Sequence, residues 1–592
     1  MSTVEQKTAG LETPANSAVA ALLQRIERLN EIGISLSSEQ DTDVLLETIL
    51  ISAKELTNSD AGTMYSRTDI NTLRFEIIRT DSLGIAMGGS TGVSINFPEL
   101  PLYKEGEPNL QMIAAYAALK DQTVNIPDAY EAKGFDFSGT RAFDKKTGYR
   151  SKSFLTVPLK NHENEIIAVL QLINAKHPVT GEIVPFSVED QQLAESLSSQ
   201  AAIALTNQRL IANLKQLFES FIQVIASAID DKSPYTGGHC HRVPILAEML
   251  AEASSDANTG ELNGFDLDDD EMYELRIAAW LHDCGKVTTP EYVVDKATKL
   301  ETIFDRIHLV NTRFKCKKQE LEISFLKEKI KALETGNTDI LPTLQKQLEE
   351  ELESLESDRK FIQVTNIGGE FMSDDKKERV ERIASITWID NEGNEEPFLS
   401  ENEVYNLNIA RGTLTSEERD IINHHVVATI KMLEQLPFPK GLENVAEYAG
   451  GHHEKLDGTG YPNGLTKDQM SIQARIMAIA DVFEALTARD RPYKDGKTLS
   501  QALKILGFMK KDNHIDPDIF QVFIDHKVFM RYAEEYLAPE QLDDVDVTAI
   551  PGYEPSHEAI DWNGLTYVGS GLPPEEVEPE PEEDEEPPSV SW

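Results

Sequence analysis

Histidine and aspartate residues gather in short clusters in the second half of this sequence. The clusters are His239 in YTGGHCHRV, His282 and Asp283 in WLHDCGK, His424 and His425 in INHHVV, His452 and His453 in GGHHEKLDGTGYP, and Asp481 in RIMAIADVFEAL. A single histidine is more often a satisfied core residue than a metal ligand, but five clusters together are poorly explained in that way. Imidazole and carboxylate groups suit first-row metals such as Fe, Mn, Ni or Zn, whereas Ca²⁺ takes oxygen ligands alone.

Asp481 is a carboxylate within an otherwise apolar helical segment. An isolated charge in that position is costly to remove from water, and its mid-helix position excludes a capping role. A salt bridge stays open, but a metal site explains the position better. Because one ion cannot use all of these ligands, we expect two ions about 3.5–4 Å apart, bridged by Asp283, which activate water and hold the phosphate that the water attacks.

The adjacent residues His452 and His453 need a particular backbone if they are to serve one ion. On a helix, which is the conformation that we expect there, neighbouring side chains diverge by about 100°. The glycines around this pair indicate a helix end, where both rings can turn toward the same point.

The elements that must position these residues are mostly helical. Helical patterning covers residues 232–300 and 411–540, and an insertion of about 110 residues, 301–410, lies between them. Within the insertion, leucine spacing on both sides of a turn predicts a helical hairpin over 314–360. The insertion separates the motifs in the sequence without separating them in space.

The N-terminal half has a different pattern. Helix, mixed strands and a closing helix over residues 21–187 predict an α+β sensor domain. Residues 188–231 contain neither Pro nor Gly and predict one long helix. Two interpretations of its apolar stripe are open, a helix packed on its own domain and a parallel dimer helix; we favour the second and expect a homodimer. The stripe consists of Leu193, Leu197, Ala201, Leu205, Leu210, Leu214 and Leu217.

The chain ends and the charge balance limit the class of protein. Residues 1–20 and the acidic, proline-rich tail 546–592 are expected to be disordered. The 56 basic and 102 acidic residues give a net charge of −46, which repels a nucleic-acid backbone. Three scattered cysteines, no signal peptide and no apolar run of roughly 20 residues predict a cytoplasmic protein with no membrane span.

The motifs HDCGK, HHEKLDGTGYPNGL, IADVFEAL and RPYK, in this order, resemble the HD-GYP family of cyclic di-GMP phosphodiesterases. The resemblance covers about 230–300 and 411–530, and it implies an all-α HD-type metallohydrolase domain over 232–545. It also implies two divalent ions, with Fe or Mn first and Ni or Zn next. The positions that match the family's metal ligands are His239, His282, Asp283, His425, His452, His453 and Asp481.

The same resemblance implies roles beside the metals. Asp283 and Lys286 take the catalytic positions, with Lys286 stabilising charge on the reacting phosphate. Arg491 and Lys494 match basic positions that hold the substrate's phosphates. Trinuclear members of the family carry Glu where this chain has Tyr235, which favours two ions.

The GYP loop has two interpretations of equal weight. The resemblance places Asp457, Gly460 and Tyr461 beside the substrate, and it implies contacts with a diguanylate cyclase partner. Glycine and proline also build loops for purely architectural reasons. Both readings stay open on the sequence alone.

The segment from VNIPDAYEAKG to LQLINAK, followed by FSVED, resembles GAF domains of the cyclic-nucleotide phosphodiesterase type. Asn174, Lys176, Phe186 and Asp190 partly match the motif of those domains. That motif is often structural, so a cyclic nucleotide, another small ligand or no ligand at all stay open for this domain.

Together these features predict a GAF-regulated phosphodiesterase that hydrolyses cyclic di-GMP to pGpG, and a further step to GMP stays open. Two alternatives stay open. One is a cyclic di-GMP receptor with low turnover that signals through the insertion, and the other is a phosphohydrolase of a different cyclic dinucleotide.

Overall fold

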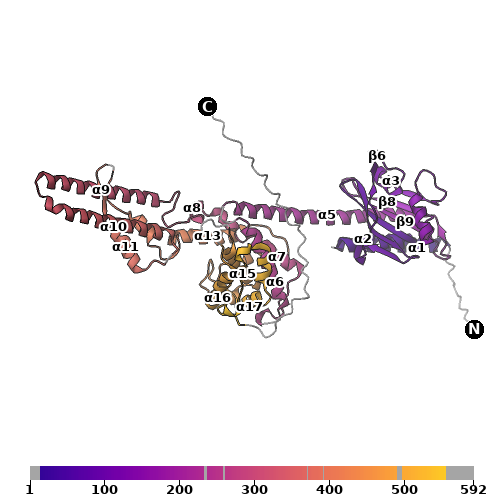
Figure 1. Cartoon of the computed structure of the whole chain (residues 1–592). Helices are drawn as coiled ribbons and strands as arrows, with labels where there is room; N and C mark the ends of the chain where they lie inside the picture. Colours follow the sequence, from indigo (N-terminus) through magenta and orange to yellow (C-terminus); the bar gives the residue numbers. More distant parts are fainter. Residues whose placement is uncertain are drawn as a thin grey trace, which may run out of the picture. The chain divides into compact units, whose positions relative to one another are not determined.

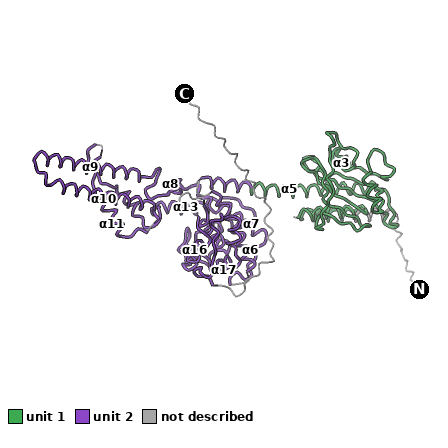
Figure 2. Tube along the Cα trace, in the orientation of Figure 1, with its two compact units in different colours: residues 1–219 green, residues 220–592 purple. Residues whose placement is uncertain are grey.

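The computed structural model of the chain describes residues 14–39, 41–232, 237–257, 260–369, 371–390, 392–489 and 496–554. It divides into two compact units, residues 1–219 and residues 220–592 (Figure 2). Helix α1 (Pro14–Ser38) begins inside the stretch 1–20 that we expected to be disordered, so that expectation is wrong from Pro14 onward. Residues 1–13 lie outside the described part.

Unit 1 is the predicted α+β domain, built on one antiparallel sheet (Figure 1). Its strand order is β3-β2-β1-β9-β8-β7, with β4 paired to β2 and β10 paired to β9. The strands of this sheet are β1 (Ser59–Arg67), β2 (Thr72–Thr80), β3 (Ile85–Gly88), β4 (Leu100–Pro101), β7 (Val124–Ile126), β8 (Phe154–Lys160), β9 (Ile166–Lys176) and β10 (Ile183–Val184). The other elements are the pair β5 (Tyr103–Lys104) and β6 (Glu107–Pro108) and the helices α2 (Thr42–Leu56), α3 (Ile113–Lys120), α4 (Ser138–Thr147) and α5 (Val188–Asp230).

The sheet is covered on both faces because its strands alternate between two cores. On β1, Met64 joins the core that α1, α2 and the first turns of α5 complete, and the next residue, Tyr65, joins the core beneath α3. Successive side chains of a strand point to opposite faces, so a strand buried on both sides reads as a continuous apolar run. β9 has this pattern, with buried residues along most of its length.

Helix α5 is continuous, but its apolar stripe is not one surface. Leu193, Leu197, Ala201 and Leu205 are buried in unit 1, whereas Leu210, Leu214 and Leu217 are 49, 65 and 66% exposed. The expectation of one continuous dimer stripe is therefore wrong for residues 193–205, which complete the core of unit 1. Only the second half of the stripe is open to a partner.

The HD-type part of unit 2 is helical, as predicted. Side-chain caps fix where its helices start: capping boxes at Asp268 and Thr415 open α7 and α13, and Ser471 caps α15. The helices are α6 (His239–Asp256), α7 (Asp269–Leu281), α8 (Glu291–Val294), α13 (Ser416–Leu433), α14 (Val445–Gly450), α15 (Ile472–Thr487), α16 (Leu499–Lys511), α17 (Pro517–Asp525) and α18 (Val528–Tyr536), with the short 3₁₀ helix η3 (Cys284–Thr288) after α7.

The insertion has a core of its own. Its hairpin consists of α9 (Ile307–Glu334) and α10 (Leu341–Ile367), which extend beyond the expected range 314–360 at both ends (Figure 1). Phe314 and Ile362 pack together with residues that follow the hairpin, such as Phe398. Those later elements are α11 (Asp374–Ala384), β11 (Thr387–Ile389), β12 (Glu395–Pro397) and α12 (Glu401–Leu407).

The two ends of the insertion are tied to each other. Thr413 Oγ1 donates to the Lys296 carbonyl oxygen at 3.0 Å. The buried Lys296 ammonium donates to Glu418 at 2.7 Å and to Asn406 at 3.0 Å. The chain thus leaves the HD-type part and returns to it at one place, which we call the neck.

The segment after α18 is packed further than expected. Ile550 is buried, and the Tyr553 hydroxyl donates to Asp525. The tail therefore does not become free at residue 546, and residues 555–592 lie outside the described part. Among the described helices, none has the length and apolar composition that crossing a membrane requires.

Candidate metal centre

One group of potential ligands comes from the starts and ends of helices in unit 2. His239 is the first residue of α6, His282 follows the last residue of α7, and Asp283 comes next. One ligand atom from each lies within 4.8 Å of the others, and all three side chains are buried. Helix ends bring these side chains together because the backbone there is free of the helical repeat.

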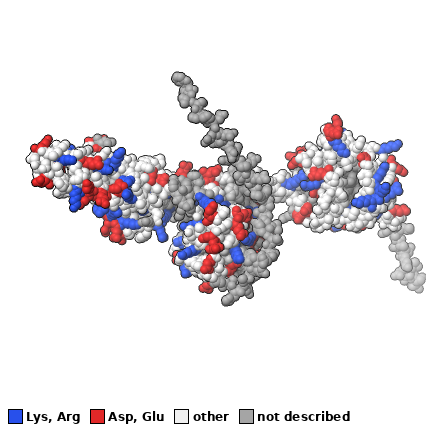
Figure 3. Space-filling model, in the orientation of Figure 1, with Lys and Arg blue, Asp and Glu red and all other residues white. Residues whose placement is uncertain are grey.

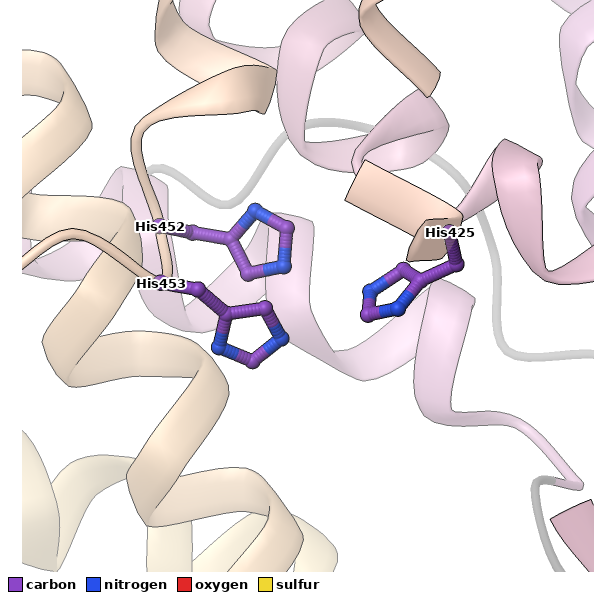
Figure 4. A group of neighbouring side chains, drawn as sticks. All are labelled: His425, His452 and His453. Atoms are coloured by element: carbon purple, nitrogen blue, oxygen red, sulfur yellow. The ribbon is translucent and has the colours of Figure 1, made fainter. Parts of the chain in front are cut away.

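A second group lies beside it and consists of histidines alone. His425 lies within α13, and His452 and His453 follow α14; their rings converge in Figure 4. The rings of His452 and His453 are 4.1 Å apart at an angle of 41°. α14 ends at Gly450, so the pair lies just beyond the helix end that the glycines indicated, in the turn that follows, and not on the helix itself. The turn allows both rings to face the same point.

Two carboxylates join the groups. Asp283 Oδ1 is 3.2 Å from His425 Nε2, and its Oδ2 is 3.4 Å from His239 Nε2 and 3.3 Å from His282 Nε2. Asp481 Oδ1 lies 3.3 Å from His239 Nε2. The structure therefore brings all seven expected ligands together, with Asp283 between the two groups. His424, the neighbour that we did not choose, is exposed.

The histidines are fixed through their Nδ1 atoms. Nδ1 of His282, His425 and His452 donates to the carbonyl oxygen of the residue three positions earlier, at 2.7, 2.5 and 2.6 Å. A ring that donates through Nδ1 presents the Nε2 lone pair on its other side. Three rings are thus oriented for ligation by their own backbone turns.

The atoms that these rings present are unsatisfied. Within the described part of the chain, the buried atoms without a hydrogen-bond partner include Asp283 Oδ1 and the Nε2 atoms of His239, His282, His425 and His452. Buried polar atoms are rarely left unpaired, since each costs free energy comparable to a lost hydrogen bond. A pair of divalent cations fits this donor set of imidazoles and bridging carboxylate, and the nitrogen content favours Fe, Mn, Ni or Zn over Ca²⁺.

Electrostatics differ between the two groups. Burial lowers the pKa of His453 to about 4. Burial also opposes charge on His282, but Asp283 and Asp481 outweigh it and raise the His282 pKa to about 9. Protons therefore compete with a metal ion mainly at the carboxylate-rich group, because an imidazole must be neutral at the ligating nitrogen.

The HDCGK motif also positions its neighbours. The Lys286 ammonium donates to Asp283 Oδ2. A Cβ on Gly285 would lie 1.9 Å from the His425 carbonyl oxygen, so only glycine fits this contact between η3 and α13. Thr429 Oγ1 accepts from the Gly285 amide at 2.9 Å and donates to the His282 carbonyl oxygen at 3.1 Å.

Two buried glutamates that support the centre were missed in the sequence. Glu484 accepts from His239 Nδ1 and, at 2.7 Å, from Arg242 Nε. Glu454 accepts from the Asn463 amide at 2.7 Å and so holds the GYP loop. The signal for Glu484 was available, since it follows Asp481 by three residues on one helix and therefore lies on the same face.

The GYP loop packs against the second group. The Tyr461 ring stacks on His453 with 4.9 Å between centroids, and burial raises the Tyr461 pKa to about 12. A Cβ on Gly460 would lie 2.3 Å from the Lys455 amide nitrogen. Asp457 is exposed and accepts from the backbone and hydroxyl of Thr459, so its contacts are those of a turn. The expected substrate ligands Arg491 and Lys494 lie outside the described residues, as does Tyr235.

The GAF motif forms a closed set of contacts. Asn174 accepts from the Lys152 amide at 2.7 Å and donates to the Arg150 carbonyl oxygen at 2.9 Å. Lys176 pairs with Asp60 at 3.0 Å. Phe186 is buried in the core, and Asp190 accepts from the amide and hydroxyl of the residue three positions earlier. These bonds tie strands to the start of α5.

Comparison with known proteins assigns a family to part of each unit. The GAF domain family matches residues 41–205, and the HD domain family matches residues 402–519. The chain carries a GAF domain followed by an HD domain, which confirms the resemblance seen in its motifs. The GAF match continues beyond the expected limit at residue 187, because the first turns of α5 belong to the core of unit 1.

Named relatives match the HD region. A cyclic di-GMP phosphodiesterase of Pseudomonas aeruginosa is 36% identical over 113 residues, which are 19% of this chain and 26% of that protein. A 3′3′-cGAMP-specific phosphodiesterase of Vibrio cholerae is 41% identical over 112 residues, 18% of this chain and 23% of that protein. A probable cyclic di-GMP phosphodiesterase of the same organism is 36% identical over 141 residues, 23% of this chain and 32% of that protein. The chain thus spans 23 to 32% of the length of these relatives.

Proposed function

We propose that unit 2 is a metal-dependent phosphodiesterase that hydrolyses a cyclic dinucleotide, with cyclic di-GMP as the first candidate. The observation that carries this proposal is the set of buried histidine Nε2 atoms and Asp283 Oδ1 that lack hydrogen bonds within the described part of the chain. The names of the relatives over the HD region support the substrate class.

The roles of the chain's own groups follow from their positions. His239, His282, Asp283 and Asp481 would hold one ion, and His425, His452 and His453 with the other Asp283 oxygen would hold the second. When bound, such ions supply positive charge at the phosphoryl oxygens and lower the pKa of water. The Nδ1 bonds keep the imidazoles in the ligating orientation, so little rearrangement is needed on binding.

Lys286 is the cation that the chain itself contributes. Its ammonium has three donors, of which Asp283 takes one, and its side chain is 29% exposed. The remaining donors can reach an oxygen of the scissile phosphate and stabilise the charge that develops there. Burial opposes the charge on Lys286, but the neighbouring Asp283 outweighs it and raises the Lys286 pKa, so the side chain stays a charged ammonium.

A second substrate is favoured by a specific observation. Three relatives named 3′3′-cGAMP-specific phosphodiesterases are 40 to 42% identical over parts of the HD region. Base selection depends on groups beside the metal centre, and Tyr461, which stacks on His453, is an aromatic side chain in such a position. Complete occupation of the seven ligand positions argues against a receptor with little turnover.

The family resemblances seen in the motifs support further roles for this chain. The products would be pGpG and then GMP, Arg491 and Lys494 would hold the phosphates, and the GYP loop would meet a diguanylate cyclase. The GAF domain would regulate the reaction, with or without a cyclic nucleotide. The protein would act in the cytoplasm.

A homodimer would carry that regulation. The second half of α5 exposes apolar residues with spacings of four and three, which suits a parallel pair of helices. These residues are Leu210, Leu214, Leu217, Phe221 and Val224, between 49 and 66% exposed.

The decisive experiment compares two adjacent histidines. The full chain, loaded with Fe²⁺ or Mn²⁺ without air, is incubated with cyclic di-GMP and with 3′3′-cGAMP, and products are separated by chromatography. His425→Ala removes a ligand and should abolish hydrolysis, whereas His424→Ala changes an exposed neighbour and should preserve it. Equal activity of the two variants, or binding without product in the unaltered chain, would overturn the proposal.

A further inference from the structure

Helix α9 has an apolar stripe that its own hairpin leaves open. Ile323, Leu326, Ile330 and Leu333 are 51, 52, 55 and 54% exposed. Buried residues such as Ala332 lie instead on the side of α9 that faces the insertion core. We call these four residues the outer stripe. Apolar surface arranged in a row on a helix that already has a packed side indicates a partner.

The spacing of the outer stripe is that of a coiled coil. Its residues follow one another by three, four and three positions, so the isoleucines fall on position a of a heptad and the leucines on position d. In a parallel coiled coil, a β-branched residue at a with leucine at d favours two strands. The a/d pattern therefore specifies the number of helices, and the flanking charges decide their direction.

Charged residues flank the outer stripe in a self-complementary order. Position g is occupied by Glu322 and Lys329, and position e by Lys327 and Glu334. In a parallel pair, position g meets position e of the following heptad on the other helix. Glu322 then faces the partner's Lys327, and Lys329 faces the partner's Glu334. Figure 3 shows both signs of charge distributed over the insertion.

An antiparallel pair would oppose this charge order. With Ile323 placed against the partner's Leu333, symmetry brings Lys329 near the partner's Lys329 and Lys327 near the partner's Lys327. Like charges at these flanking positions disfavour the antiparallel pair. The flanking residues thus distinguish a second copy in parallel from the reversed orientation.

The available segment is limited to the outer part of α9. Nearer the neck, Lys317 donates to the Thr387 carbonyl oxygen at 2.7 Å, and Glu320 accepts from the Ile389 amide at 3.0 Å. The β11–β12 pair therefore covers that part of the helix. Beyond Glu320 the stripe is exposed, and packing on α10 already maintains the helix, so association does not have to create it.

We propose that residues 322–334 of α9 form a parallel two-stranded coiled coil with the same residues of a second copy of this chain. The occupant is a second copy because the flanking charges match themselves. This contact is separate from the exposed half of α5 and does not depend on the activity of the metal centre.

A cysteine scan tests the register directly. In the full chain carrying Cys316→Ser, Leu326→Cys places a thiol at position d, and Ser324→Cys places one at the outward position b. Under mild oxidation, Leu326→Cys should form inter-chain disulfides about tenfold faster than Ser324→Cys, because d positions of a parallel pair face each other within disulfide reach. Cys240 and Cys284 are buried and remain in both variants. Equal rates would overturn the proposal.

Charge exchange tests the choice of partner. In the Leu326→Cys background, Glu322→Lys with Lys329→Glu repels itself, and so does Lys327→Glu with Glu334→Lys. A mixture of the two variants restores both pairs and should recover the disulfide that each alone loses. Failure of the mixture to recover it would overturn a parallel self-contact. A dimer that forms through α5 while the 326 disulfide stays absent would also overturn it, so the two contacts are separable.

Discussion

The two domains of this chain each contain a cluster of polar residues, and the clusters differ in whether their buried polar atoms have hydrogen-bond partners. In the GAF domain, Asn174 and Lys176 have their polar atoms paired with neighbouring backbone and with Asp60. In the HD domain, the Nε2 atoms of His282 and His452 are buried without a hydrogen bond among the described residues.

The difference separates a structural motif from a ligand site. A polar cluster that pairs internally gains stability from its own hydrogen bonds, whereas one that leaves several buried atoms unpaired needs an added group to compensate. Both clusters were visible in the sequence as motifs. Only the pairing of their atoms in the fold shows which one requires an outside ligand.

The largest effect is expected from removing the link between the two ligand groups. His282→Ala combined with Asp283→Ala should reduce hydrolysis by about 10³-fold or more, since metal stabilisation of the transition state contributes several kcal/mol. The measurement is product formation by the full chain. A matched change in the other cluster, Asn174→Gly, should leave the metal content of the protein unchanged; a loss of metal in that variant would contradict the contrast.

A smaller effect is expected from the carboxylate that orients His239. Glu484→Gln keeps the size of the side chain but removes its charge, and metal affinity should fall by about 10- to 100-fold, as for other residues that hold metal ligands in place. Metal titration of the full chain measures this change. Glu540→Gln, at an exposed ion pair with Arg489, is the control and should bind metal normally. If Glu484→Gln binds metal as tightly as that control, Glu484 does not orient the site.

Metal removal should affect the stability of the HD domain alone. At a free metal concentration 100 times the dissociation constant, binding stabilises the folded state by about 2.7 kcal/mol, and a chelator removes this contribution. Calorimetry of the full chain with and without chelator should show one transition moving and the GAF transition unchanged. A shift of the GAF transition would mean that its cluster also binds metal.

The smallest effect is expected from removing the Asn174 side chain from the hydrogen-bonded cluster of the GAF domain. Asn174 has a positive φ of 60°, which glycine tolerates, so Asn174→Gly removes the side-chain bonds without straining the backbone. Unfolding of the GAF domain should become easier by about 2 kcal/mol, because the Lys152 and Ser153 amides lose an acceptor. Urea denaturation of the full chain, followed by far-UV circular dichroism, measures this change. An unchanged midpoint would show that the motif is not structural.

Much of the centre could be predicted from the sequence because its ligand types are rare at buried positions. A carboxylate such as Asp481 in an apolar helix is costly unless paired, so its position alone suggested a site. The order of the motifs then indicated the other positions that match the family's ligands. The glycines beside His452 and His453 indicated a helix end, but the residue at which α14 ends, Gly450, could not be predicted, because helix ends vary by one or two residues.

The helix α5 shows why burial was harder to predict than periodicity. Leu205 and Leu214 belong to the same apolar pattern, but Leu205 is buried in the core of unit 1 and Leu214 is exposed. The pattern records that a side of the helix is apolar, and it does not record which element covers that side. Glu484 was missed for a related reason, because its role depends on His239, which is distant in the sequence.

The neck at Lys296 and Thr413 has a consequence for engineering. Since the chain departs and returns where Thr413 Oγ1 meets the Lys296 carbonyl oxygen, a short connector between the two ends should cost little loop-closure entropy. A shortened chain that kept Lys296, Thr413 and Glu418 would still contain all seven expected ligands.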